Sequence, residues 1–384
     1  MIPAGMPDLS AISLRKSAAL AFFALIAAAF LGCSVQQAAP PKEVEIVLIA
    51  AGDNLIHSRL IADAKNKDGY DFTPIYEKIK PLVKSADLAF INQETPIAGE
   101  SFGYSGYPAF NAPTAVGDAI YETGFRVINH ASNHAMDKGK RAVLAMINFW
   151  EKRPDAIVLG IHASKEDRAK KRIVSIKGVK IGFLAYTYGL NGIRLPKDSP
   201  YLVSMIDLGV MAEEIDALRP LCDFLLVSMH WGTEYAHVPD KQQERLAAFL
   251  AEHKVDLIIG HHPHVLQPVR WVQRQDGAKT LVYFSLGNFV SAQSKKPRML
   301  GGIARVVLGA KGGSVGIKSA ALLGSVTHFE RGFRGFKVYA LESYTEEIAR
   351  LHALAAAPER MDLSYLRKLY LSIVAEEFRA PLDK

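Results

Sequence analysis

Cysteine is scarce in this chain, because Cys33 and Cys222 are the only two among 384 residues. A disulfide framework of the kind that stabilises small secreted domains is therefore excluded. Cys222 begins the apolar run CDFLLVSMH and is expected to be an inert core thiol. The apolar run over residues 17–32 is a little shorter than the roughly 20 residues needed to span a bilayer. Internal repeats and long low-complexity segments are also lacking.

The sequence contains no recognisable nucleic-acid-binding module, although the net charge is +7. The densest basic patches are residues 295–298 and 331–337. Such patches are either solvated charge at loops and strand ends or a contact surface for an anionic polymer. No nucleic-acid partner is expected. The length and the hydrophobic fraction of 49% are ample for a large core.

The N-terminal segment has the features of a targeting signal. Arg15 and Lys16 precede the apolar run, which ends in small residues before Cys33. The sequence FLGC resembles a bacterial lipoprotein box, which implies that Cys33 is lipidated and anchors the chain to a membrane. Ordinary secretion and an uncleaved anchor are the alternatives. We expect a signal peptide over 1–32, a flexible tether over 33–43, and a mature protein in the cell envelope outside the cytoplasm.

Strand and helix patterns alternate from residue 44 onward, which predicts an α/β layered fold. Pro74 after Thr73 favours a helix start, with Thr73 as its N-cap and the helix running to about residue 85. A hairpin is expected around Lys177 and Gly178, and further antiparallel strands between residues 301 and 323. We expect one domain over 44–342 and a helical extension over 343–384.

Six apolar strands end in Asp, Glu, Asn or His side chains. The carboxyl ends of strands form the ligand-binding crevice of open α/β sheets, so these groups are expected to converge. The polar residues at these ends include Asp53, Glu94, Asn133, His134, His230, His262, His264 and Asn288.

A mixture of imidazole, carboxylate and amide donors without a thiolate favours hydrolytic metals, so we expect one or two divalent ions such as Mn, Zn or Fe. Two neighbouring ions would clamp the attacking and leaving oxygens of a phosphoester. A bridging ligand would have to be a carboxylate, and Asp53 and Glu94 are the candidates. The metal ligands are predicted to be Asp53, Glu94, Asn133, His230, His262 and His264.

The motif GHHPHV places three histidines within four positions. In extended backbone, His262 and His264 would point to one side and His261 would face away. Asp137 is expected either to orient His134 or to cap the next helix. Four further residues are possible ligands or supports of the ligands: His57, His130, His261 and Asn288, with His130 expected to be structural and His261 expected to support the ligands.

Several motifs together resemble the CapA family, proteins associated with poly-γ-glutamate capsule synthesis and built on a calcineurin-like metallophosphoesterase fold. They occur in the family's order: GDNLIH (52–57), NQETPI (92–97), FNAP (110–113), NHASNHAMD (129–137), HWGTEY (230–235), GHHPHVLQP (260–268) and SLGNF (285–289). The resemblance implies a four-layer α/β/β/α sandwich with C-terminal helices. It also implies that His134 is the general acid that protonates the leaving oxygen. Leu55 and the triplet 92–94 depart from the wider superfamily pattern, which has a histidine and an aspartate pair there.

Three functions follow from these features. The first is a metal-dependent phosphoesterase-type hydrolase of capsule or envelope material. The second is a non-hydrolytic binding component for the assembly, export or anchoring of an anionic polymer. The third is a lipoprotein scaffold with a relict site. The expected partners are an anionic polymer or phosphoester substrate, the membrane through Cys33, and other envelope assembly proteins.

Overall fold

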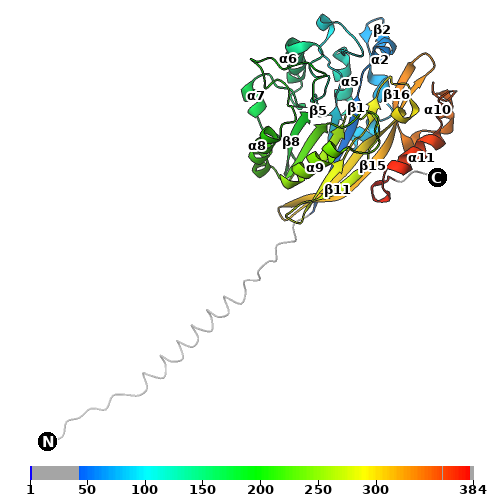
Figure 1. Ribbon diagram of the computed structural model, residues 1–384. Coiled ribbons are helices and arrows are strands. Elements are labelled where there is room, and N and C mark those ends of the chain that lie inside the picture. The colour runs from blue at the N-terminus through cyan, green and yellow to red at the C-terminus, as the bar shows by residue number, and fades with distance from the viewer. Residues whose placement is uncertain (2–42, 357, 381–384) are drawn as a thin grey trace. The chain divides into compact units, whose positions relative to one another are not determined.

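The computed structural model describes Met1, residues 43–356 and residues 358–380 (Figure 1). Cys33, the predicted lipidation site, and the predicted signal peptide lie outside the described residues, apart from Met1. The span Glu43–Lys384 forms one compact unit. Within the described part of the chain, no helix is both long enough and apolar enough to cross a bilayer.

Two sheets form the centre of the fold. The first has the strand order β16-β15-β14-β1-β4-β5-β6, with β13 paired to β1. Its strands are β1 (Val44–Asn54), β4 (Leu88–Asn92), β5 (Val127–Asn129), β6 (Ile157–Leu159), β13 (Asn288–Val290), β14 (Leu300–Lys311), β15 (Ser314–Glu330) and β16 (Arg334–Ala340). Strands β1, β4, β5 and β6 run parallel, whereas β14, β15 and β16 continue the sheet in antiparallel pairs.

The second sheet has the order β11-β12-β10-β9-β8-β7. Its strands are β7 (Arg172–Ile176), β8 (Val179–Thr187), β9 (Phe224–His230), β10 (Leu257–His261), β11 (Val269–Gln273) and β12 (Lys279–Tyr283). The four central strands are parallel, and the edge strands β7 and β11 are antiparallel to their neighbours. A two-stranded hairpin of β2 (Lys65–Asn66) and β3 (Gly69–Tyr70) stands apart from both sheets.

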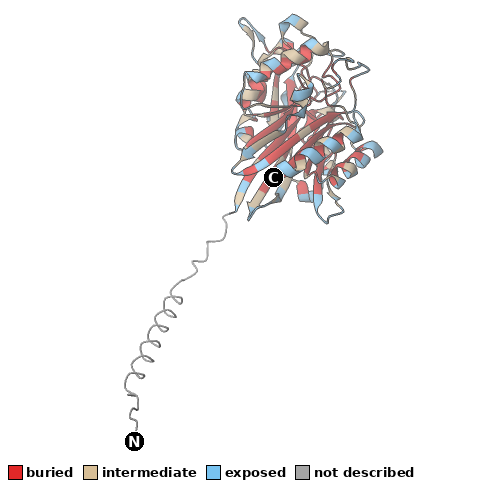
Figure 2. Cartoon of the chain, turned by 90° about the vertical axis from the view of Figure 1, so that its left-hand side faces the viewer, coloured by how far each residue is buried: buried red, intermediate tan, exposed pale blue. Residues whose placement is uncertain are grey.

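The two sheets face each other across an apolar interior. In β9, Leu226 packs with side chains of the first sheet, whereas Leu225 and Val227 point to the opposite face. This alternation is expected of a strand buried on both faces. The contact continues to the strand ends, where Phe90 of β4 stacks on His261 of β10 with ring centroids 5.6 Å apart. Figure 2 shows the buried strands beneath helices whose outer faces are exposed.

Helices pack on both sheets. The first sheet carries α2 (Ser58–Asp63), α3 (Thr73–Tyr76), α4 (Lys80–Lys84), α5 (Ala115–Thr123) and α6 (Gly139–Glu151). The second sheet carries α8 (Leu208–Leu218) and α9 (Lys241–Glu252), and the short α7 (Lys165–Ala169) precedes β7. Helix α9 begins with a capping box between Asp240 and Gln243. The predicted mixed α/β class is confirmed.

The predicted helix from Thr73 to about residue 85 is two short helices. Thr73 is the first residue of α3, and Phe72 rather than Thr73 precedes it as the N-cap. The break comes before Pro81, which has no amide hydrogen to donate and whose ring collides with the carbonyl four residues earlier. The sequence reasoning also missed the edge strands β11 and β16.

The C-terminal helices are α10 (Glu346–Leu351) and α11 (Leu363–Ile373). Helix α11 lies along β15 (Figure 1), and its Leu366 and Tyr370 side chains are buried in the core of the first sheet. The Tyr370 hydroxyl donates to the carbonyl oxygen of Leu322 on β15 at 2.6 Å. The C-terminal segment is therefore part of the core packing of this unit.

Candidate metal-binding site

Asp53 lies at the end of β1, where the strand pairs with both β4 and β13. Its Cα partners are Asn92 and Asn288, and the register shifts beside it on both sides. The preceding residue is glycine because a Cβ at Gly52 would lie 2.1 Å from the carbonyl oxygen of Gly287. Asn92 Nδ2 donates to Asp53 Oδ1 at 2.9 Å. The carboxylate is thus completely buried and held in one orientation.

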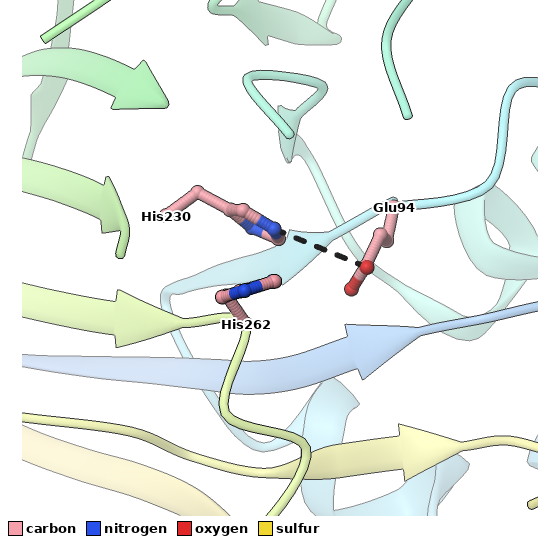
Figure 3. Close-up of side chains that lie close together, drawn as sticks. All are labelled: Glu94, His230 and His262. Atoms are coloured by element: carbon pink, nitrogen blue, oxygen red, sulfur yellow. Dashed lines mark ion pairs between the residues drawn. The ribbon is translucent and has the colours of Figure 1, made fainter. Parts of the chain in front are cut away.

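Glu94 follows β4, and neither of its buried carboxylate oxygens has a hydrogen-bond partner. Its Oε1 atom lies 3.9 Å from His230 Nε2 and 3.7 Å from His264 Nε2. Figure 3 shows His230 and His262 pointing at the Glu94 carboxylate from two neighbouring strand ends. A buried carboxylate without donors is unfavourable unless a positive charge compensates it. The site therefore favours a cation beside Glu94.

The histidines after β10 reach the site by a turn rather than by extended backbone. His262 has a φ of 97° and His264 a φ of 58°, both in the left-handed region. The prediction that His261 faces away is wrong, because its Nδ1 atom lies 3.5 Å from Asp53 Oδ1. His261 is the last residue of β10 and pairs in register with His230, so both side chains project from the same face of the sheet.

Two sets of three donors share Glu94. Glu94, His230 and His262 bring one ligand atom each within 4.8 Å of one another, and so do Asp53, Glu94 and His264. A carboxylate common to two donor sets suits a bridging position between two ions. The donor chemistry, imidazole with carboxylate and no thiolate, fits divalent metals of the Mn, Zn or Fe type. These side chains therefore meet the chemical requirements of a divalent-metal site.

Asn133 and His134 come from the loop after β5. Asn133 Oδ1 lies 2.9 Å from His230 Nε2, which places the amide oxygen beside the donor cluster. His134 Nδ1 lies 2.7 Å from Asp137 Oδ2. Of the two roles considered for Asp137, the structure has the first, because α6 has Lys138 as its N-cap and no side-chain cap. Holding Nδ1–H in this way leaves His134 Nε2 free to exchange a proton.

The electrostatic environment of the cluster favours a positive charge. Burial raises the pKa of the Glu94 carboxyl well above its usual value. Burial acts on Asp53 in the same direction, but the neighbouring imidazoles of His261 and His264 outweigh it and lower its pKa. Burial alone would lower the pKa of His264, yet the charge of Glu94 and the contact with Asp53 raise it to about 9. The pKa of His262 falls to about 4, mainly through burial.

The remaining predicted residues lie around this cluster. His57 precedes α2, and its Nδ1 atom lies 3.1 Å from the carbonyl oxygen of Leu55. It belongs to neither of the two donor sets that share Glu94. His130 accepts a hydrogen bond from Trp150 Nε1 at 2.8 Å, as expected of a structural histidine. Asn288 Nδ2 donates to Gln293 at 3.0 Å, and its buried Oδ1 has no partner.

Sequence reasoning missed Glu234 and the aromatic residues at the site. Glu234 is exposed and can join His262 and His264 in a third donor set. Tyr188 lies over His262 with ring centroids 4.7 Å apart, and Tyr235 lies 6.1 Å from His264. Glu234 could have been found, since it follows His230 in the same strand-end motif. Tyr188 follows the last residue of β8, a strand whose polar end was not considered.

The fold and the site together define a class of protein: a two-sheet α/β protein whose strand ends gather carboxylates, histidines and an amide into a buried cation-binding cluster. The sequence model of a family described as "Bacterial capsule synthesis protein PGA_cap" matches residues 47–293. The matched segment contains every residue of the cluster. The chain belongs to this family, which confirms the family predicted from the motifs.

Two curated relatives come from Bacillus. "Capsule biosynthesis protein CapA" of Bacillus anthracis is 29% identical over 268 residues, covering 66% of this chain and 62% of that protein. "PGA biosynthesis protein CapA" of Bacillus subtilis (strain 168) is 26% identical over 243 residues, covering 62% of each. The alignments thus span less than two thirds of the length of these relatives.

Solved structures with partial similarity include a 5'-nucleotidase precursor from Thermus thermophilus, with a TM-score of 0.45 and 14% identity, covering 86% of this chain and 58% of that one. Another is the calcineurin-like phosphoesterase YfkN from Bacillus subtilis, with a TM-score of 0.41 and 12% identity, covering 74% and 91%. Similarity at this level does not bear on the function of this chain.

Proposed function

We propose that this chain is a metal-dependent hydrolase of phosphoester-type bonds that works in the biosynthesis of poly-γ-glutamate capsule or another cell-envelope polymer. The observation that carries the proposal is Glu94, whose two buried oxygens have no hydrogen-bond partner and which belongs to two donor sets. A buried carboxylate of this kind is costly in a purely structural role. It is useful where it holds cations at a reaction centre.

One or two divalent ions, of the Mn, Zn or Fe type, would be held by Asp53, Glu94, Asn133, His230, His262 and His264. When bound, such ions supply Lewis-acid activation of water and neutralise charge on a phosphoryl group. The protein holds these donors rigidly. Asn92 fixes Asp53, and the two sheets carry ligands that meet at one edge.

His134 would protonate the leaving oxygen. Asp137 accepts a hydrogen bond from His134 Nδ1, which leaves Nε2 as the nitrogen that donates the proton. The rings of Phe110 and His134 pack at right angles with centroids 4.7 Å apart, which limits the rotation of His134. Proton donation by a positioned histidine contributes about 10²–10⁴-fold to a rate.

The proposal includes a location and partners. A chain lipidated at Cys33 would act outside the cytoplasm at a membrane surface, near its polymer and the other proteins of envelope assembly. The motif around Cys33 and the net charge of +7 support this view. Mass spectrometry of the protein purified from membranes tests it, because lipidation at Cys33 requires cleavage after Gly32.

A second function is favoured by a specific departure in the site. An acidic residue at position 92 would add negative charge to the site, but the residue there is Asn92. Its amide donates a hydrogen bond to Asp53 and accepts one from Asn129. A cluster with fewer carboxylates is also suited to binding an anionic polymer without cleaving it. Binding without turnover would make the chain a component of assembly, export or anchoring.

Metal analysis followed by an activity assay tests the proposal. The purified full chain should contain a stoichiometric divalent metal and hydrolyse an aryl phosphate. His134→Ala should abolish turnover and retain the metal. Metal with polymer binding but no turnover of any phosphoester would support the second function. A metal-free protein whose histidine variants behave like the wild type would contradict both functions.

A further inference from the structure

A cavity of about 380 Å³ opens at the edge of the fold where β6 of the first sheet meets β7 and β8 of the second. Helices α7 and α8 border it. None of its lining residues belongs to the metal-binding cluster. Its walls are largely apolar, and they include Val158, Leu159, Phe183, Leu184 and Leu218.

The rim of the cavity is basic. Two acidic residues, Glu213 and Glu214, line the cavity. They are outnumbered by five basic residues: Lys165, Arg168, Lys170, Lys171 and Arg172. Part of this charge is already matched, because Arg168 pairs with Glu214 at 2.8 Å and Arg172 with Asp167 at 2.9 Å. Lys165 and Lys171 form no ion pair with any described residue, so their charge is available to a ligand.

A buried histidine supplies a polar group to this cavity. The His162 side chain lines the wall and the residue is only 7% exposed, yet its Nδ1 atom has no hydrogen-bond partner. Its Nε2 atom lies 2.8 Å from the Ser204 hydroxyl. Burial, together with the charges of Arg168 and Arg172, lowers the pKa of His162 to about 3. The ring is therefore neutral and has one proton to place.

The direction of the hydrogen bond between Ser204 and His162 determines which ring nitrogen carries the proton. When Ser204 donates to Nε2, the ring proton must be on Nδ1. Nδ1–H is then a buried donor without a hydrogen-bond partner, on a residue that lines the cavity. An unpaired buried donor costs free energy unless a ligand accepts its hydrogen bond. This unpaired donor distinguishes the cavity from a packing defect.

We propose that this cavity is a binding site for a small organic anion that has a carboxylate head and an apolar body. The carboxylate would accept a hydrogen bond from His162 Nδ1–H and face the cations of Lys165 and Lys171. The apolar body would cover Phe183 and Leu184. This inference is independent of the proposed hydrolase function, because it uses none of the same residues.

Calorimetric titration of the full chain with octanoate tests the site, with octanol and inorganic phosphate as probes that each lack one half of the ligand. Octanoate should bind saturably with a stoichiometry of one, whereas octanol and phosphate should bind much more weakly. The double variant Lys165→Gln/Lys171→Gln should bind octanoate about tenfold more weakly, since charge-assisted hydrogen bonds are lost. The matched double variant Lys67→Gln/Lys78→Gln, at exposed positions away from the cavity, should bind like the wild type.

Two variants of His162 separate binding from folding. His162→Phe removes the donor and should weaken octanoate binding, whereas His162→Gln keeps a donor and should retain most of the affinity. Thermal melts of both variants show whether the fold is intact. Equal binding of octanol, equal binding of phosphate, or unchanged affinity in the lysine and phenylalanine variants would each overturn the proposal.

Discussion

His264 and Asp53 are 211 positions apart in the chain, yet His264 Nδ1 lies 3.0 Å from Asp53 Oδ2. Asp53 lies one residue before the end of a strand of the first sheet, and His264 follows a strand of the second. The contact joins the two sheets at the edge where the metal donors meet. An ion held there would therefore connect ligands from both sheets and stabilise their packing.

Metal binding should stabilise the folded protein measurably. At a Mn²⁺ concentration of 100 times the Kd, the free energy of unfolding should rise by about 2.7 kcal/mol. Thermal melts with Mn²⁺ and with EDTA measure this change. Glu94→Gln should lose the stabilisation, because Glu94 belongs to two donor sets. Glu234→Gln is the matched control, since Glu234 is exposed and belongs only to the third set. A Mn²⁺ effect of full size in Glu94→Gln would contradict the assignment.

His134 should matter most for substrates with poor leaving groups. A general acid helps when the departing oxygen is basic, so His134→Ala should reduce kcat/KM for phenyl phosphate by about 10²–10⁴-fold. The loss for p-nitrophenyl phosphate should be much smaller. Asp137→Asn should give a weaker version of the same pattern, because Asp137 only orients the ring. Equal losses for both substrates would argue for a binding role instead.

Residues at the ends of parallel strands were the predictable part of the site. Asp53, Glu94 and His230 each follow an apolar run, and parallel strands deliver their carboxyl ends to one edge of a sheet. The apolar pattern is enough to locate that edge. The structure brings these three residues together with the loop residues Asn133 and His264.

The direction of side chains within the histidine loop was not predictable. Alternation assumes extended backbone, whereas His262 and His264 have positive φ angles that break it. Contacts between distant elements were equally hidden. The partner of His130 is Trp150 on α6, and no local pattern links a strand end to that helix face. These features depend on tertiary packing, which the periodicity of a single sequence does not contain.

His130 should be a stability residue and not a metal ligand. His130→Phe leaves the Trp150 indole N–H buried without an acceptor, which should cost about 1–3 kcal/mol of unfolding free energy. Urea unfolding measures the loss, and metal analysis of the folded variant should give the wild-type content. His130→Gln, which keeps an acceptor, should recover part of the stability. Loss of metal without loss of stability would assign His130 to the metal-binding cluster instead.

His352 should make the protein less stable in mild acid. It packs against His328 with ring centroids 5.2 Å apart, and burial lowers the pKa of each to about 4. In the neutral ring, Nε2–H donates to the Thr327 carbonyl oxygen and Nδ1 accepts from Leu354 N–H, so a second ring proton has no place.

Because the folded pKa lies below the unfolded value of about 6.5, the unfolded state binds more protons between about pH 6.5 and pH 4. The contribution is fully present above pH 6.5 and is lost as the pH falls through this window, with a slope of at most about 1.4 kcal/mol per pH unit for each proton. Urea unfolding of the wild type and of His352→Gln at several pH values should show a shallower acid loss in the variant. The charge of His352 also helps to lower the pKa of His328, so the difference between the two proteins measures His352 together with its effect on His328. Identical slopes would contradict its role.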